Sequence, residues 1–156
     1  MALKKGDRAP AFTLYDTEKK YRSLSEFLGK KTVLVFYPGA FTGVCTKEMC
    51  TFRDSLATLG SLNAQVVGIS VDSPFANKTF AALNKLTFPL LSDFSRDVSA
   101  SYGGIQEDFS GLKSYKASKR SVFVLDSGGI VQYAWITDNP GVEPPYAEVE
   151  RAVSSL

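Results

Sequence analysis

Histidine is absent from the 156 residues of this chain, and cysteine occurs only twice, as Cys45 and Cys50. The lack of histidine excludes Ser-His-Asp and Cys-His catalytic arrangements within the chain, and with them histidine-held zinc, iron and haem. Two cysteines are too few for a metal cage of three or four thiolates in one chain. Strong nucleophilic chemistry is therefore left mainly to cysteine, lysine or a carboxylate.

Long apolar runs and a strong charge of either sign are also missing. The longest apolar run, 33–37, is far short of the roughly 20 residues that span a bilayer, and the first residues have no stretch suited to a signal peptide. Lys and Arg number 18 against 16 Asp and Glu, with no basic tract, so neither nucleic acid nor a membrane is expected as a partner. We expect a cytoplasmic protein, and in a reducing compartment two nearby cysteines are more often redox-active than structural.

Strand-like and helix-like segments alternate along most of the chain. The length suits one domain over 1–156, and 44% hydrophobic and 22% charged residues are typical of a soluble fold. Hydrophobic patterning predicts strands over 11–15, 31–37, 64–71, 88–92, 121–125 and 130–136, and helices over 25–28, 42–59, 73–85, 96–102 and 146–153, with a polar loop over 106–119. The order predicts an α/β domain of three layers, with a mixed, mainly parallel central sheet, helices on both faces and a C-terminal antiparallel hairpin.

Cys45 stands out because a buried strand feeds a helix just before it. Pro38 and Gly39 stop the strand 31–37, and Thr42 is a good N-cap for the helix that follows. Cys45 then falls in the first helical turn, where unpaired N–H groups and the helix dipole favour a thiolate and should lower the thiol pKa. Thr42 is placed to direct its hydroxyl toward the sulfur or a bound substrate oxygen. The alternative is a buried structural thiol beside an ordinary cap.

The spacing of the two cysteines argues against a static crosslink. Five residues along a helix separate two Cα atoms by roughly 8.7 Å, from about 7.5 Å of rise and about 140° of rotation. A disulfide needs about 4.4–6.8 Å, so Cys45 and Cys50 cannot pair while the helix is intact. A transient disulfide requires local unwinding. The alternative for Cys50 is a buried core thiol.

Arg120 and Glu48 are the charged residues that bear on this helix. Arg120 directly precedes the strand 121–125, and its guanidinium reaches Cys45 only if that strand runs antiparallel to the strand 31–37. Otherwise it is a solvated charge at a strand end. Glu48 lies one turn after Cys45, where a carboxylate disfavours a thiolate. It therefore makes better sense as an anchor for an arginine or as a surface residue.

The run 38–45, Pro-Gly-Ala-Phe-Thr-Gly-Val-Cys, resembles the peroxiredoxin signature Pro-x-x-x-Thr/Ser-x-x-Cys. Three more blocks follow the family in the same order: Gly-Asp-Arg-Ala-Pro-Ala-Phe at 6–12, Phe-Pro-Leu-Leu-Ser-Asp at 88–93 and Arg-Ser-Val-Phe-Val-Leu-Asp at 120–126. The Cys-x-x-x-x-Cys spacing is similar to the bacterioferritin-comigratory, or peroxiredoxin Q, group. The blocks around Thr42 and Pro89 also resemble the alkyl hydroperoxide reductase E group, which often uses one cysteine. One departure is Gly43, where many relatives have proline.

The resemblance implies a thioredoxin-like fold and a thiol peroxidase without metal, haem, flavin or other cofactor. Cys45 matches the peroxidatic cysteine, and Cys50 matches the resolving cysteine. Thr42 matches the residue that hydrogen-bonds the peroxide. Pro38 matches the residue that shields the sulfenic acid, and Arg120 the arginine that supports the thiolate and the transition state.

The predicted activity is reduction of hydrogen peroxide and organic hydroperoxides. Cys45 becomes a sulfenic acid, Cys50 condenses with it to a disulfide, and thioredoxin or a similar dithiol restores both thiols. The partners implied are a peroxide and that reductant, in a monomer or weak homodimer. Three alternatives remain open: a one-cysteine peroxidase recycled by an external thiol, a thiol–disulfide oxidoreductase, and a non-enzymatic redox sensor or holdase.

Overall fold

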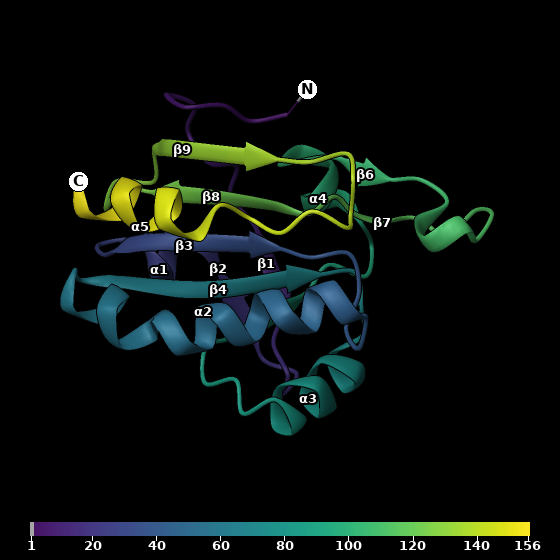
Figure 1. Cartoon of the computed structure of the whole chain (residues 1–156). Helices are drawn as coiled ribbons and strands as arrows, with labels where there is room; N and C mark the ends of the chain where they lie inside the picture. The colour runs from purple at the N-terminus through teal and green to yellow at the C-terminus, as the bar shows by residue number, and fades with distance from the viewer. Residues whose placement is uncertain (1) are drawn as a thin grey trace.

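A central sheet of seven strands organises the molecule in the computed structural model, which describes residues 2–156 (Figure 1). The strand order across the sheet is β2-β1-β5-β4-β3-β8-β9. The strands are β1 (Thr13–Tyr15), β2 (Tyr21–Ser23), β3 (Lys31–Phe36), β4 (Ala64–Ser70), β5 (Leu90–Ser92), β8 (Ser121–Leu125) and β9 (Val131–Ile136). The helices are α1 (Leu24–Phe27), α2 (Gly43–Ser61), α3 (Pro74–Leu83), α4 (Asp97–Ser101) and α5 (Tyr146–Ser154).

The sheet is mixed, with parallel strands at its centre. β3 pairs in parallel with β4, and β4 with β5, whereas β8 runs antiparallel to β3 and forms the predicted hairpin with β9. On the other side, β1 pairs antiparallel with both β5 and β2. Strands β2, β3, β4, β5 and β9 therefore run in one direction, and the predicted architecture is confirmed.

β3 supplies side chains to two hydrophobic cores because successive residues of a strand point to opposite faces. Val33 and Val35 pack with residues of α2, α3 and α5, and Leu34 and Phe36 pack with residues of α1 and α4. All four side chains are fully buried, and each such burial contributes about 1.5–3 kcal/mol. Helices thus cover both faces, as predicted, and the long α2 lies along the sheet in Figure 1.

α2 approaches the sheet closely at Gly68 of β4. A Cβ at this position would lie 2.8 Å from Cε of Met49 and 2.6 Å from Cδ2 of Leu90, which is closer than real Cβ contacts. The missing side chain lets the first turns of α2 lie against β4. This contact helps to fix where the helix begins, and so where Cys45 lies.

Several predicted boundaries were wrong. α2 continues past Gly60, and the left-handed residue is Asn63 at φ 59°, whose N–H donates to the Gly60 carbonyl. The predicted loop 106–119 contains most of a small hairpin of β6 (Ile105–Gln106) and β7 (Ala117–Ser118), together with a 3-10 turn at Phe109–Gly111. β2 was not predicted, since its three residues are largely polar and it pairs only at the sheet edge. Within residues 2–156, no helix has the length and apolar character needed to cross a bilayer.

One edge of the sheet gathers the segments that matter for chemistry. Phe36, at the end of β3, is level with Ile69 near the end of β4 and with Ser121 at the start of β8. The loop before α2, the loop before α3 and the residue before β8 therefore meet at one end of the sheet, where β3 and β4 point in Figure 1. Open α/β sheets bind ligands at this kind of edge.

Candidate active site

Cys45 lies in the first turn of α2, at the carboxyl end of the central strand β3. Thr42 is the N-cap with extended backbone angles, as predicted, and Cys45 is the third helical residue. Its side chain is fully buried in the core that contains Tyr37 and Met49. The succession of β3, a short loop and α2 therefore places this sulfur at the edge of the sheet.

Burial raises the pKa of the Cys45 thiol. From the sequence, the helix N-terminus is expected to lower this pKa, and that direction is wrong for the buried thiol. Three groups oppose the effect of burial and lower the pKa: the Arg120 guanidinium, the Thr42 hydroxyl and the backbone at Gly39. The Glu48 carboxylate acts with burial and raises it. Moving the thiolate out of water destabilises it by more than these three groups stabilise it, so the pKa is raised. The donors are nonetheless grouped around the atom on which negative charge would form.

Arg120 reaches Cys45 because β8 runs antiparallel to β3, which is the condition that the sequence left open. The guanidinium is 1% exposed, and its positive charge lowers the pKa of the Cys45 thiol. Its Nη1 donates to Oε1 of Glu48 at 2.8 Å, while Nε and Nη2 donate to the Pro140 carbonyl at 3.0 and 2.6 Å. The alternative of a solvated strand-end charge is wrong, since the guanidinium is buried and held from two sides by Glu48 and Pro140.

Glu48 is the anchor of this arginine and not a surface residue. Its side chain is fully buried, and Oε2 has no hydrogen-bond partner among the residues that the structure describes. Burial raises the pKa of the carboxyl to about 8, against the lowering effect of Arg120. One guanidinium thus serves two buried acids, the carboxyl of Glu48 and the thiol of Cys45.

Replacing Glu48 with glutamine should flatten the pH dependence of stability. The folded-state pKa of about 8 exceeds the ordinary 4.5, so the folded protein binds the extra proton between these values. The free energy of unfolding therefore falls as pH rises from about 5 to 8, with a contribution of roughly 1 kcal/mol per pH unit from this group. Urea unfolding at pH 5 and pH 8 measures it. Glu148→Gln, on α5, should keep the wild-type slope, and an unchanged slope in Glu48→Gln contradicts the assignment.

Thr42 and Pro38 belong to the loop that joins β3 to α2. Thr42 makes no capping bond with its side chain and instead donates its hydroxyl to the Gly39 carbonyl at 2.8 Å. Pro38 is buried directly after Tyr37, on the same loop. The structure thus brings Pro38, Thr42, Cys45 and Arg120 to one place.

Cys50 lies further along the same unbroken helix and is not beside Cys45. Both thiols are free, and α2 is helical from Gly43 to Ser61. The Cys50 side chain is half-buried, with Sγ 3.7 Å from Oδ1 of Asn84 at the end of α3. A disulfide therefore requires unwinding of α2 between the cysteines, as the spacing predicted.

Two contributors to the site were missed by sequence reasoning. Pro140 acts through its backbone carbonyl, which no side-chain pattern reveals, although the turn signals at 139–141 marked the loop. Asp72 accepts the backbone N–H of Ala40 at 2.8 Å from the loop after β4. The signal available for it was its position after a buried strand at the same sheet edge.

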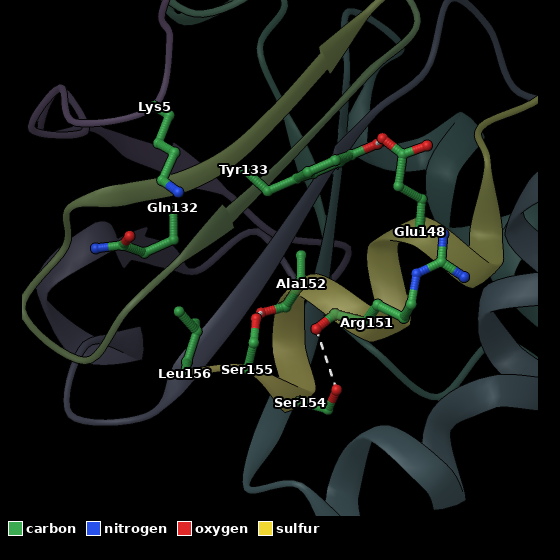
Figure 2. A pocket seen from close by; sticks show the side chains of 9 residues that line it. All are labelled: Lys5, Gln132, Tyr133, Glu148, Arg151, Ala152, Ser154, Ser155 and Leu156. Atoms are coloured by element: carbon green, nitrogen blue, oxygen red, sulfur yellow. Dashed lines mark hydrogen bonds between the residues drawn. The ribbon is translucent and has the colours of Figure 1, made fainter.

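A separate hollow lies away from these residues (Figure 2). It encloses about 630 Å³ between β9 and α5, and its lining includes Lys5, Tyr133, Glu148 and Arg151. Lys31, which begins β3, donates to the Val153 carbonyl near the end of α5. The hollow therefore belongs to the end of the sheet opposite Cys45, and none of the predicted site residues lines it.

Comparison with known proteins gives consistent matches over almost the whole chain. Residues 5–134 match the AhpC/TSA family. A putative peroxiredoxin of Mycobacterium tuberculosis is 42% identical over 132 residues, covering 85% of this chain and 84% of that protein. The crystal structure of peroxidoxin BcpB from the same organism has a TM-score of 0.83 at 32% identity, covering 98% and 96% of the two chains. A PrxQ mutant structure from Xylella fastidiosa has a TM-score of 0.86 at 25% identity, covering 99% and 98%.

Proposed function

Because the chain belongs to the AhpC/TSA family of peroxiredoxins, we propose that it reduces hydroperoxides with Cys45 as the attacking thiolate and Cys50 as the resolving thiol. Peroxiredoxins act on peroxides and are recycled by thiol reductants, so thiol peroxidase activity follows from membership. The assignment of steps to residues rests on one observation above all. The buried Arg120 guanidinium is fixed by Glu48 and Pro140 at the sheet edge where Cys45 lies, and its charge lowers the pKa of the Cys45 thiol.

In the first step the Cys45 thiolate attacks one peroxide oxygen and the O–O bond breaks. The sulfur is oxidised to a sulfenic acid, and the second oxygen leaves with the bonding electrons and is protonated to water or an alcohol. Negative charge moves from sulfur to the leaving oxygen. Arg120 and the Gly39 backbone stabilise this charge in a site that excludes water, and Thr42 hydrogen-bonds the peroxide. Pro38 covers the sulfenic acid within the same loop.

In the second step Cys50 condenses with the sulfenic acid. A sulfur–sulfur bond forms and water leaves, so no further oxidant is needed. α2 unwinds between the two cysteines, and the half-buried position of Cys50 shortens the movement that frees it. A thioredoxin-like dithiol then exchanges with this disulfide and returns both thiols. We propose that a monomer or weak homodimer suffices, since Cys45 and Cys50 belong to one chain.

Intact masses of wild type and Cys50→Ser after one equivalent of hydrogen peroxide test this sequence of steps. The wild type should lose two hydrogens, and the variant should gain one oxygen. A wild type that gains oxygen without forming a disulfide would leave Cys45 as the peroxide-reactive thiol and make Cys50 a packing residue. Recycling would then pass to an external thiol, as in a one-cysteine peroxidase. No mass change in either protein contradicts the proposal.

A further inference from the structure

The peptide unit between Gly39 and Ala40 is held at both of its ends. Its N–H donates to Oδ2 of Asp72 at 2.8 Å, and its carbonyl accepts the Thr42 hydroxyl at 2.8 Å. A peptide unit is planar and rigid, so a partner that fixes the N–H also fixes the direction of the carbonyl. Asp72 and Thr42 are thus connected through one backbone group, although they do not touch.

The Asp72 carboxylate is itself directed at this loop. Its Oδ2 also accepts the Ser70 hydroxyl at 2.8 Å, and the Ser70 oxygen accepts the Asp72 N–H at 3.2 Å. Ser70 ends β4, which pairs directly with β3. The carboxylate is therefore attached to the rigid centre of the sheet, while the peptide that it holds belongs to the active-site loop.

The loop needs such a support because it contains an unfavourable backbone conformation. Phe41, between the held peptide and Thr42, has φ 68°, in the left-handed region that an aromatic side chain rarely adopts. Its ring is 53% exposed and makes an edge contact with Phe80. The Asp72 contact fixes the Gly39–Ala40 peptide, just before Phe41, so its loss would let Phe41 relax and move Thr42.

We propose that Asp72 is a positioning residue for Thr42, acting through the Gly39–Ala40 peptide. The inference rests on the proposed peroxidase function and concerns how that site binds its substrate. All hydrogen bonds in the chain point toward the carboxylate: hydroxyl to carbonyl, and N–H to Asp72. Such bonds polarise one another. The Thr42 proton is held on the Gly39 carbonyl, which leaves the lone pairs of Oγ1 facing the site as acceptors for the O–H of a hydroperoxide.

A double-mutant cycle between Asp72 and Thr42 tests this coupling. Asp72→Ala should lower kcat/KM for hydrogen peroxide about tenfold to a hundredfold, since misplacement of a positioning group by about 1 Å has such effects. Asp72→Asn should stay within about threefold of wild type, because its amide oxygen still accepts the Ala40 N–H. In a Thr42→Val background, Asp72→Ala should cost less than about twofold, since the group that it positions is gone.

Asp126→Ala is the matched control. Asp126 also accepts backbone N–H groups, from Gly128 and Ile130 in the turn between β8 and β9, at the end of β8 away from Cys45. The Asp126→Ala variant should have the wild-type kcat/KM for hydrogen peroxide. Asp72→Glu, which keeps the charge but displaces the carboxylate, replaces Asp72→Ala should the alanine variant not fold, with the same Thr42-dependent loss expected.

The outcomes separate this inference from the proposed function. Losses for Asp72→Ala and Thr42→Val that multiply in the double variant, or an Asp72→Asn variant as slow as Asp72→Ala, overturn the positioning role while leaving a working peroxidase. A wild type no faster than Cys45→Ser overturns the proposed function and this inference together.

Discussion

Replacing Cys45 with serine is expected to lower the rate of peroxide reduction by at least about 1,000-fold. The hydroxyl that replaces the thiol is not ionised near neutral pH, and its oxygen cannot take up a peroxide oxygen as sulfur does. What remains is Cys50, a half-buried thiol in the body of α2 with no contact to Arg120 or Thr42. Removing one donor from a preorganised anion site costs about a hundredfold to a thousandfold in rate, and this change removes the atom that we propose to react.

Peroxide consumption coupled to a thioredoxin system measures this loss. Cys50→Ser, given an excess of a small external thiol, is the matched control, since it keeps the Cys45 site and changes the other cysteine. It should retain fast oxidation in its first turnover. A Cys45→Ser variant that consumes peroxide at the wild-type rate would mean that the buried sulfur is structural, and it would overturn the proposed function.

The position of Cys45 was predictable because local rules decide it. A buried strand that stops before Pro38 and a helix N-cap at Thr42 leave little freedom for the residue three positions after the cap. The same rules predicted the hairpin of β8 and β9 and the start of α3 at Pro74. These features depend on residues that are neighbours in sequence.

The surroundings of Cys45 depend on residues that are distant in sequence, and the sequence left them open. Arg120 and Glu48 are separated by 72 positions, and only the antiparallel pairing of β8 with β3 brings them together. Burial of Glu48 could not be inferred from a residue type that is usually exposed. The direction of the Cys45 pKa was wrong for the same reason, since the helix terminus is a local feature and desolvation is a property of the packed core.

The Arg120 guanidinium therefore interacts with two buried acidic groups, the carboxyl of Glu48 and the thiol of Cys45. Glu48 holds Arg120 in place, and Cys45 needs its charge when the thiolate forms. Removing either partner of this buried pair would leave the other without its hydrogen bond, which is strongly destabilising. Glu48 thus fixes the orientation of the Arg120 guanidinium and at the same time lowers the fraction of Cys45 that is ionised.

Arg120→Lys provides the sharpest test of this orientation. Lysine keeps the positive charge but lacks the planar fork that donates to Glu48 and Pro140 together. If charge alone mattered, the lysine variant would be nearly as fast as wild type. We expect kcat/KM for hydrogen peroxide to fall about a hundredfold, the typical cost of losing one oriented donor at a developing anion. Arg120→Met, which also removes the charge, should fall further.

The pH dependence of Cys45 alkylation in these variants separates orientation from charge. Arg120 lowers the pKa of Cys45, so Arg120→Met should shift the alkylation profile to higher pH, whereas Arg120→Lys should shift it less. Arg96→Lys is the matched control, since Arg96 also donates to a backbone carbonyl, that of Lys116, outside the site. A lysine variant with a wild-type peroxide rate would show that the fork is dispensable. The contacts to Glu48 and Pro140 would then serve only to fill a buried space, and orientation would play no part in the chemistry.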